Sequence, residues 1–207
     1  MRLYDFPFSP NCRKVRAVAY ELGVTFEHVP VDLLEGEQRS PAFLARNPNG
    51  RVPVLEDGDL LLWESTAIIR YLAAGTALVP TGRRPAAEVD RWIAWQLAHL
   101  GPAMSKVAFE RIVKRLTRKG TPDPALIEAG TADFAAMTAI LDGALAGKEY
   151  VAGPLSIADF ALAAHYSLAS ACGLDLAPFS RVASWLDRMA ARDSMKRALT
   201  DAQVSRA

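Results

Sequence analysis

The chain has 207 residues, of which 51% are hydrophobic and 23% are charged, and this composition excludes a wholly disordered chain. It carries 24 lysines and arginines against 23 aspartates and glutamates, and the net charge of +1 gives no indication of a nucleic acid or an anionic membrane as a partner. Two cysteines, Cys12 and Cys172, cannot build a disulfide framework, so we expect a reducing compartment.

Residues 1–76 alternate between strand and helix patterns. Val15, Val18, Ala19 and Leu22 follow helical spacing, and Asp57-Gly58 between two apolar runs indicates a hairpin. The segment 33–47 is polar and loop-like, with one helical turn near Phe43. We predict strands at 1–5, 25–31, 52–55 and 60–63 and helices at 10–22 and 64–74. With the helical turn near Phe43 counted as the second helix, the order is βαβαββα.

The chain after residue 76 has a different, purely helical pattern. Pro80 and Gly82 interrupt the pattern, so we predict a domain at 1–76, a linker at 77–84 and a second domain at 85–207. Expected helices span 85–117 with a kink at Gly101-Pro102, 124–146, 157–172 and 181–191, with a short helix near Met195. The fold class is therefore α/β followed by all-α.

No segment indicates a membrane span or a signal peptide. The longest uncharged apolar stretch, 160–174, is shorter than the roughly 20 residues that a spanning helix needs. Charged residues already occur at Arg2, Asp5, Arg13 and Lys14, unlike in a signal peptide. We expect a cytoplasmic protein without a membrane partner.

Ser9-Pro10-Asn11-Cys12 lies at the start of the first expected helix. Pro10 suits the first helical position, which makes Ser9 the expected N-cap. The free N–H groups and the helix dipole at this end favour an anion, and a thiolate placed there has a lowered pKa. The alternative is that Ser9 only caps the helix.

Two further pairs carry signals of binding. Pro53 in Val52-Pro53 cannot donate to a strand ladder, so it is either a plain edge residue or a cis proline beside backbone groups that bind an extended peptide. Glu64-Ser65 opens a helix, where Ser65 can present donors to a carboxylate and Glu64 can hold an ammonium group. The alternative for this pair is an ordinary cap with a favourable first-turn acid.

Taken together and in this order, these features resemble the cytosolic glutathione S-transferase superfamily. Within it, the chain looks like a bacterial-style member of the serine-type classes (theta, delta and phi). The resemblance covers the whole chain. It is densest at 3–16 and at 47–72. Within the second range, 47–55, 57–58 and 62–68 look like the glutathione-binding signature of that family.

The resemblance implies a thioredoxin-like domain that binds glutathione, a helical domain that binds the second substrate, and a homodimer. It implies that Ser9 donates a hydrogen bond to the glutathione sulfur and that Asn11 adds a donor. Val52 then pairs with the cysteinyl unit, Pro53 is cis, Glu64 and Ser65 hold the γ-glutamyl head group, and Gln38 and Arg51 are candidates for the glycyl end. Residues expected to line the substrate pocket between the domains are Phe8, Leu34, Met104, Ala108 and Arg111.

Two residues compete with Ser9 for the chemistry. Tyr4 lies on the first strand, where tyrosine-type classes place a catalytic tyrosine. Ser9-x-x-Cys12 has the spacing of a redox motif whose first cysteine is replaced, so Cys12 has either a packing or a redox role. We prefer Ser9, because Ser-Pro-x-Cys-Arg at the helix start matches the serine pattern.

The predicted activity is conjugation of glutathione to small hydrophobic electrophiles, a detoxification reaction, with peroxide reduction as a side activity. Alternatives are a glutathione-dependent isomerase, which the Ser9-Pro10-Asn11 run disfavours, a disulfide reductase, and a non-catalytic binding member. Ser156 and Asp159 have the spacing of a capping box and carry no catalytic role. His28, His99 and His165 share no metal-ligand spacing, so we expect no metal site.

Overall fold

A computed structural model describes residues 1–118 and 120–204, with side chains described to Thr200. The chain forms two compact units. Residues 1–79 and the described part of 190–207 make the first, and residues 80–189 make the second.

The first unit is built on a four-stranded sheet with the order β2-β1-β3-β4. The central strand β1 is parallel to β2 and antiparallel to β3, and β4 is antiparallel to β3. Gly58, at φ +61°, lies in the β3–β4 turn, a conformation that favours glycine, so the Asp-Gly hairpin is confirmed. The strands are β1 (Arg2–Asp5), β2 (Glu27–Pro30), β3 (Val54–Asp57) and β4 (Leu60–Trp63).

Helices α1 (Pro10–Glu21) and α3 (Ser65–Leu72) accompany the sheet, and the expected helical turn near Phe43 is α2 (Pro41–Leu44). A 3-10 turn at Glu37–Arg39 precedes α2. The observed order with a mixed sheet is the expected thioredoxin-like arrangement.

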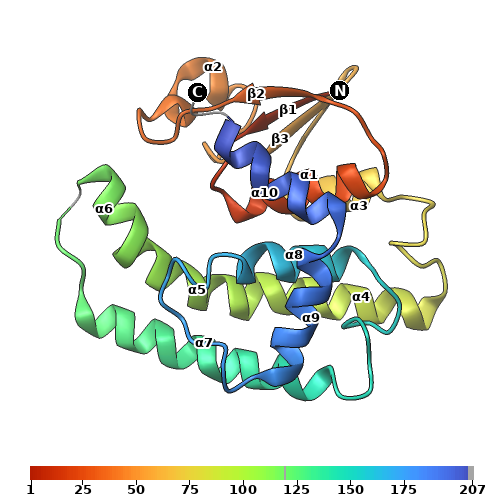
Figure 1. Ribbon diagram of the computed structural model, residues 1–207. Helices are drawn as coiled ribbons and strands as arrows, with labels where there is room; N and C mark the ends of the chain where they lie inside the picture. The colour runs from red at the N-terminus through yellow and green to blue at the C-terminus, as the bar shows by residue number, and fades with distance from the viewer. Residues whose placement is uncertain (119, 205–207) are drawn as a thin grey trace. The chain divides into compact units, whose positions relative to one another are not determined.

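The C-terminal helix α10 (Asp193–Val204) belongs to the first unit and lies along α1 (Figure 1). Arg16 on α1 donates to the Ala198 carbonyl at 3.1 Å, and Ser194 donates to Glu21 at 2.6 Å. The observed division therefore differs from the expected helical domain at 85–207, because these bonds connect its last helix to α1. The helix is also longer than the short one expected near Met195.

The second unit opens with one helical run from residue 83 to residue 117. Its α-helical parts are α4 (Arg83–Trp95), α5 (Gly101–Ala108) and α6 (Lys114–Thr117), separated by π-helical segments at Gln96–Leu100 and Phe109–Val113. At the expected kink, the Gly101 N–H donates to the Gln96 carbonyl five residues back. Pro102, which follows, has no N–H to donate to the helix. The helix continues past it because the π-helical turn before Pro102 is wider than an α-helical turn.

Three more helices complete the second unit: α7 (Pro124–Ala144), α8 (Ile157–Tyr166) and α9 (Ser180–Ala190). The expected capping box is confirmed, and the buried Asp159 accepts bonds from Val151 N, Ser156 N and Ser156 Oγ at 2.9 to 3.1 Å. The Trp185 indole also donates to Asp159 at 3.1 Å, which joins α9 to the start of α8. Helix α8 ends at Tyr166, earlier than the expected residue 172.

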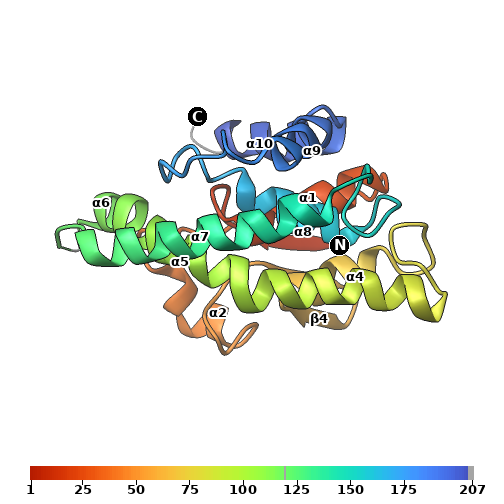
Figure 2. The same cartoon turned by 90° about the horizontal axis from the view of Figure 1, so that it is seen from below.

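Helix α7 is the one helix of the described residues that is long and apolar enough to cross a membrane, judged by length and composition alone. It is not an uncharged stretch, because Glu128, Asp133 and Asp142 interrupt its sequence. It runs alongside α5 (Figure 2), and Lys106 on α5 pairs with Asp133 on α7 at 2.7 Å. The core helix of a soluble protein passes the same test of length and composition.

Candidate functional site

Ser9 is the N-cap of α1, as expected. Its Oγ accepts a bond from the Cys12 N–H at 3.4 Å, and its own N–H donates to the Phe6 carbonyl at 3.0 Å. Pro10 follows at the start of the helix. A hydroxyl oxygen that accepts a bond keeps its proton for donation, so Ser9 can donate to a ligand atom beside the helix terminus.

The loop before Ser9 is held by Arg16. The Arg16 guanidinium, 1% exposed, donates to the Pro7 carbonyl at 2.9 Å and to both Asp5 carboxylate oxygens at 2.6 and 2.5 Å. Burial by itself raises the pKa of Asp5, but the bond from His28 and the charge and bonds of Arg16 outweigh it and leave that pKa below its ordinary value. Arg16 thus fixes the loop that presents Ser9.

Asn11 and Ser65, predicted from separate motifs, meet in the structure. The Ser65 hydroxyl, on the first residue of α3, donates to Asn11 Oδ1 at 3.3 Å. Glu64 precedes it as an exposed residue at φ +71°, a left-handed backbone value that a non-glycine residue rarely adopts. The bond joins the first turns of α1 and α3 and places the expected thiol and head-group subsites side by side.

The Val52–Pro53 peptide bond is cis, as the resemblance implied. Val52 lies two residues before β3 begins at Val54. Its side chain packs in one core cluster with Cys12, whose N–H bonds Ser9, so the Val52 segment and the Ser9 cap share a support. The cluster comprises Tyr4, Cys12, Val31, Phe43, Val52 and Val54.

Gln38 and Arg51 lie on either side of a close backbone contact. Gly50, which precedes Arg51, packs against the Gln38 carbonyl. A Cβ at Gly50, which has φ +59°, would lie 3.0 Å from the Gln38 carbonyl, so a side chain there would be crowded and its backbone strained. The Gln38 side-chain oxygen is buried without a hydrogen-bond partner among the described residues. Arg51 is exposed, and its carbonyl accepts a bond from Asn47 at 2.7 Å. An unpartnered acceptor and an exposed guanidinium thus flank one backbone turn.

The structure bears on both competitors of Ser9. The Tyr4 hydroxyl donates to Glu56 at 3.0 Å and accepts from Arg46 at 2.9 Å, so it is engaged in another network. Cys12 is completely buried, and burial raises the pKa of its thiol well above the ordinary value. These contacts favour Ser9 over Tyr4 and packing over redox chemistry for Cys12.

Sequence reasoning missed Lys14, a lysine without any exposed surface. Its ammonium donates to Thr66 Oγ1 at 3.3 Å, one residue beyond the bond between Asn11 and Ser65. The available signal was its spacing: Lys14 follows Asn11 by three residues and so shares a helix face with it.

The expected substrate-pocket residues lie in both units. Phe8 and Leu34, in the first, are 36% and 45% exposed. In the second, Met104 is buried and Ala108 is partly buried. Their grouping around one pocket stays a prediction.

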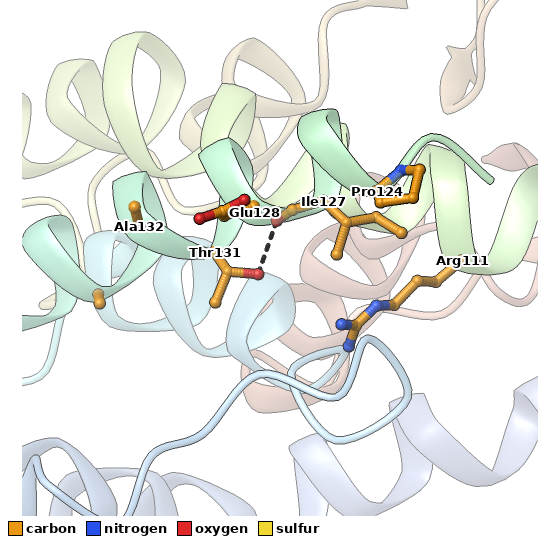
Figure 3. Close-up of a pocket in the computed structure, with 7 residues that line it drawn as sticks. Arg111, Pro124, Ile127, Glu128, Thr131 and Ala132 are labelled. Carbon is orange, nitrogen blue, oxygen red and sulfur yellow. Dashed lines mark hydrogen bonds between the residues drawn. The ribbon is translucent and has the colours of Figure 1, made fainter.

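Arg111 has a different environment within the second unit. Its guanidinium donates to the carbonyls of Cys172 at 2.5 Å and Gly173 at 3.2 Å. It also borders a hollow of about 620 Å³ along α7, where Thr131 bonds the Ile127 carbonyl (Figure 3). The other lining residues are Pro124, Glu128, Ala132 and Ala135.

Across the described ranges, no group of three or more histidine, cysteine, aspartate and glutamate side chains could hold a metal ion.

Comparisons with known proteins point in one direction. Residues 1–74 match the model of the glutathione S-transferase N-terminal domain. Over 209 aligned residues the chain is 36% identical to glutathione S-transferase 3 of Zea mays, covering 95% of this chain and 92% of that protein.

Solved structures agree. Glutathione transferase F7 from Populus trichocarpa superposes with a TM-score of 0.87 at 30% identity, covering 95% and 96% of the two chains. A glutathione S-transferase I bound with lactoylglutathione has a TM-score of 0.87 at 28% identity, covering 96% and 98%. Of the three proteins named here, the two with a stated source are from plants, so the bacterial style expected from the sequence is not confirmed.

Proposed function

The chain belongs to the glutathione S-transferase family, and from this we propose that it is a serine-type transferase in which Ser9 activates the thiol of bound glutathione. The observation that carries the proposal is the position of Ser9 as N-cap of α1, with its oxygen accepting from the helix and its proton available to a ligand. The sulfur then meets a hydroxyl donor and the positive end of the helix dipole.

The free energy needed to ionise the bound thiol at neutral pH is modest. A free thiol has a pKa of about 8.5, so only a few per cent is ionised at neutral pH. Lowering this pKa by about two units takes roughly 2.7 kcal/mol. A hydroxyl bond to a charged sulfur supplies about 1.5–3 kcal/mol and a helix N-terminus about 0.3–1 kcal/mol, which together reach this value.

The other residues hold the tripeptide. Glu64 takes the ammonium and Ser65 the carboxylate of the γ-glutamyl head group, and Asn11, bonded to Ser65, aligns this subsite with Ser9. The Val52 backbone pairs with the cysteinyl unit ahead of β3, in the manner of an added strand. Gln38 and Arg51 bind the glycyl end: the unpartnered Gln38 oxygen accepts from the glycyl N–H, and the exposed Arg51 cation pairs with the glycyl carboxylate.

The thiolate attacks small hydrophobic electrophiles that apolar residues of the second unit bind. Its sulfur forms a bond to the electrophilic carbon, and the leaving group departs with the bonding pair. The same thiolate can attack a peroxide oxygen, which breaks the O–O bond and releases an alcohol or water; a second glutathione then reacts with the resulting sulfenic acid to give glutathione disulfide and water, so peroxide reduction is the proposed side activity. The alternative is a non-catalytic binding member, and the Ser9 cap together with the bond between Asn11 and Ser65 favours the enzyme.

Steady-state kinetics of the Ser9→Ala variant with a chromogenic aromatic halide test the proposal. Because the hydroxyl bond, worth about 1.5–3 kcal/mol, is removed while the helix dipole stays, we expect kcat to fall about 10- to 100-fold while KM for glutathione changes less than about threefold. The matched control is Cys12→Ala, three residues further along the same helix, which should retain turnover. Loss of activity in Cys12→Ala with full activity in Ser9→Ala would overturn the proposal in favour of redox chemistry.

We also propose a homodimer that acts in the cytoplasm. Leu61 and Trp63 on the edge strand β4 and Tyr71 on α3 are 38%, 39% and 42% exposed, and a second copy would cover this apolar surface. Light scattering after size-exclusion chromatography should give twice the mass of the chain, and cell fractionation should find it in the soluble cytoplasmic fraction. A monomer across the micromolar range would contradict the dimer.

A further inference from the structure

A hollow in the first unit lies at the far end of α1 from Ser9. It has a volume of about 190 Å³ and is bounded by α1, by the loop that leads into β2, and by α10. Tyr20, which lines it, follows Ser9 by eleven residues, and this is about 16 Å along a helix axis. The hollow is therefore separate from the proposed glutathione site.

One wall of the hollow is aromatic. The Tyr20 and Phe26 rings stack with their centroids 5.6 Å apart and an interplanar angle of 17°, and the centroids of Phe26 and His28 are 4.7 Å apart. The Tyr20 hydroxyl and His28 Nε2 also share a hydrogen bond of 3.0 Å. Because these contacts hold the three rings in place, a planar ligand ring would meet a surface that is already ordered.

A cation lies beside this wall. The Arg197 guanidinium on α10 also lines the hollow, and its carbon is 4.0 Å from the centroid of the Tyr20 ring, a cation–π contact. The nearby Arg192 and Lys196 each pair with a carboxylate, whereas Arg197 pairs with none among the described side chains.

The chemistry of this guanidinium favours one kind of ligand group. A guanidinium over a ring uses its face, whereas its N–H donors lie in its own plane. Arg197 is exposed, so these donors can reach a ligand in the hollow. Their fork geometry suits a carboxylate, which can accept two parallel bonds.

We propose that this hollow is a binding site for a small planar aromatic carboxylate. The ligand ring packs on Tyr20 and Phe26, and the carboxylate pairs with Arg197. The volume limits the ligand to about one ring, since pockets for drug-sized ligands measure roughly 300–1,000 Å³. Because Arg197 is on α10 and the rings are on α1 and beside β2, the bound ligand connects α10 to the rest of the first unit.

Titration of the wild type with benzoate, followed by the chemical shifts of the backbone amides, tests the proposal. We expect a dissociation constant of about 1 mM or tighter, as a ligand of this size can reach. The largest shifts should fall at residues 20–28 and 193–200. Two probes separate the contributions: benzamide keeps the ring without the charge, and cyclohexanecarboxylate keeps the charge without an aromatic face. Each should bind at least about fivefold more weakly than benzoate.

Two variants and a matched control identify the contacts. Arg197→Met keeps an unbranched side chain without the charge, and should weaken benzoate binding about tenfold and benzamide binding less than about twofold. Phe26→Leu should weaken both ligands, because it removes part of the aromatic wall. The control is Lys196→Met, at an exposed cation next to Arg197 on the same helix, which should bind benzoate as the wild type does. Unchanged amide shifts elsewhere in the first unit show that each variant is folded.

Several outcomes would overturn the proposal. Equal benzoate affinity in the wild type and Arg197→Met means that the cation is not used, and equal affinity for benzoate and cyclohexanecarboxylate means that the aromatic wall is not used. Displacement of benzoate by S-methylglutathione, with shifts centred on Ser9, means that the ligand occupies the proposed glutathione site instead. Absence of binding at about 10 mM benzoate also overturns the proposal, and the proposed transferase function stands in each of these cases.

Discussion

Replacing Arg16 by methionine tests how the loop that carries Ser9 is supported. Arg16 makes two bonds to Asp5, one to the Pro7 carbonyl and one to the Ala198 carbonyl, from a side chain that is 1% exposed. It therefore joins the end of β1, the loop before Ser9 and helix α10. Methionine fills similar volume but leaves the buried Asp5 carboxylate without its cation.

The expected cost follows from these contacts. Removing one partner of a buried ion pair costs about 3–5 kcal/mol, because the remaining Asp5 charge then keeps the bond from His28 but loses its buried cation. The two carbonyls lose about 1 kcal/mol each, although the contributions of one network are not additive. We expect Arg16→Met to lower the free energy of unfolding by about 4 kcal/mol, a large share of the 5–15 kcal/mol typical of a folded protein.

Equilibrium unfolding in urea measures this loss through the midpoint at constant slope. The matched control is Arg91→Met, because the Arg91–Glu88 pair is exposed on both sides and should contribute less than about 1 kcal/mol. Removing Asp5 as well, in Asp5→Leu/Arg16→Met, should cost less than the sum of the two single changes. A loss below about 1 kcal/mol in Arg16→Met, or strict additivity, would refute the reasoning.

Three further predictions concern named residues. Asp159→Ala should destabilise the protein by about 4 kcal/mol in urea unfolding, because Val151, Ser156 and Trp185 lose their buried acceptor; a loss under about 1 kcal/mol would contradict this. Because the pKa of Asp5 is lowered in the fold, its stabilisation is present above the ordinary value of 3.8 and is lost as pH falls through the folded value; urea midpoints measured toward acid should show a weaker decline in Asp5→Asn. Tyr4→Phe should keep turnover within about threefold, since its hydroxyl is engaged by Glu56, and a fall as large as that of Ser9→Ala would return Tyr4 to candidacy.

Local sequence patterns were sufficient for several elements of the first unit. The Asp-Gly hairpin, the N-cap at Ser9 and the apolar spacing of α1 depend on contacts between near neighbours, so they could be predicted from residues a few positions apart. The capping box of Ser156 and Asp159 is local in the same sense.

Features that depend on distant residues could not be predicted in this way. The docking of α10 on α1 uses Arg16 and Glu21, which lie more than 170 positions from Ala198 and Ser194 in the chain. Likewise, the bonds from Asn11 to Ser65 and from Lys14 to Thr66 join segments that the sequence shows only as separate motifs. Helical periodicity also continued past Tyr166, where the backbone leaves the helix.

The central claim is that Ser9 ionises the thiol of bound glutathione. Its most direct test is the pKa of that thiol, followed by thiolate absorbance as pH is varied, in the wild type and in Ser9→Ala at saturating glutathione. We expect a pKa about two units below the free value of about 8.5 in the wild type, and a pKa within about one unit of the free value in Ser9→Ala, where only the helix dipole still favours the thiolate. The same lowered pKa in both proteins would contradict the account, because another group would then be responsible for the ionisation.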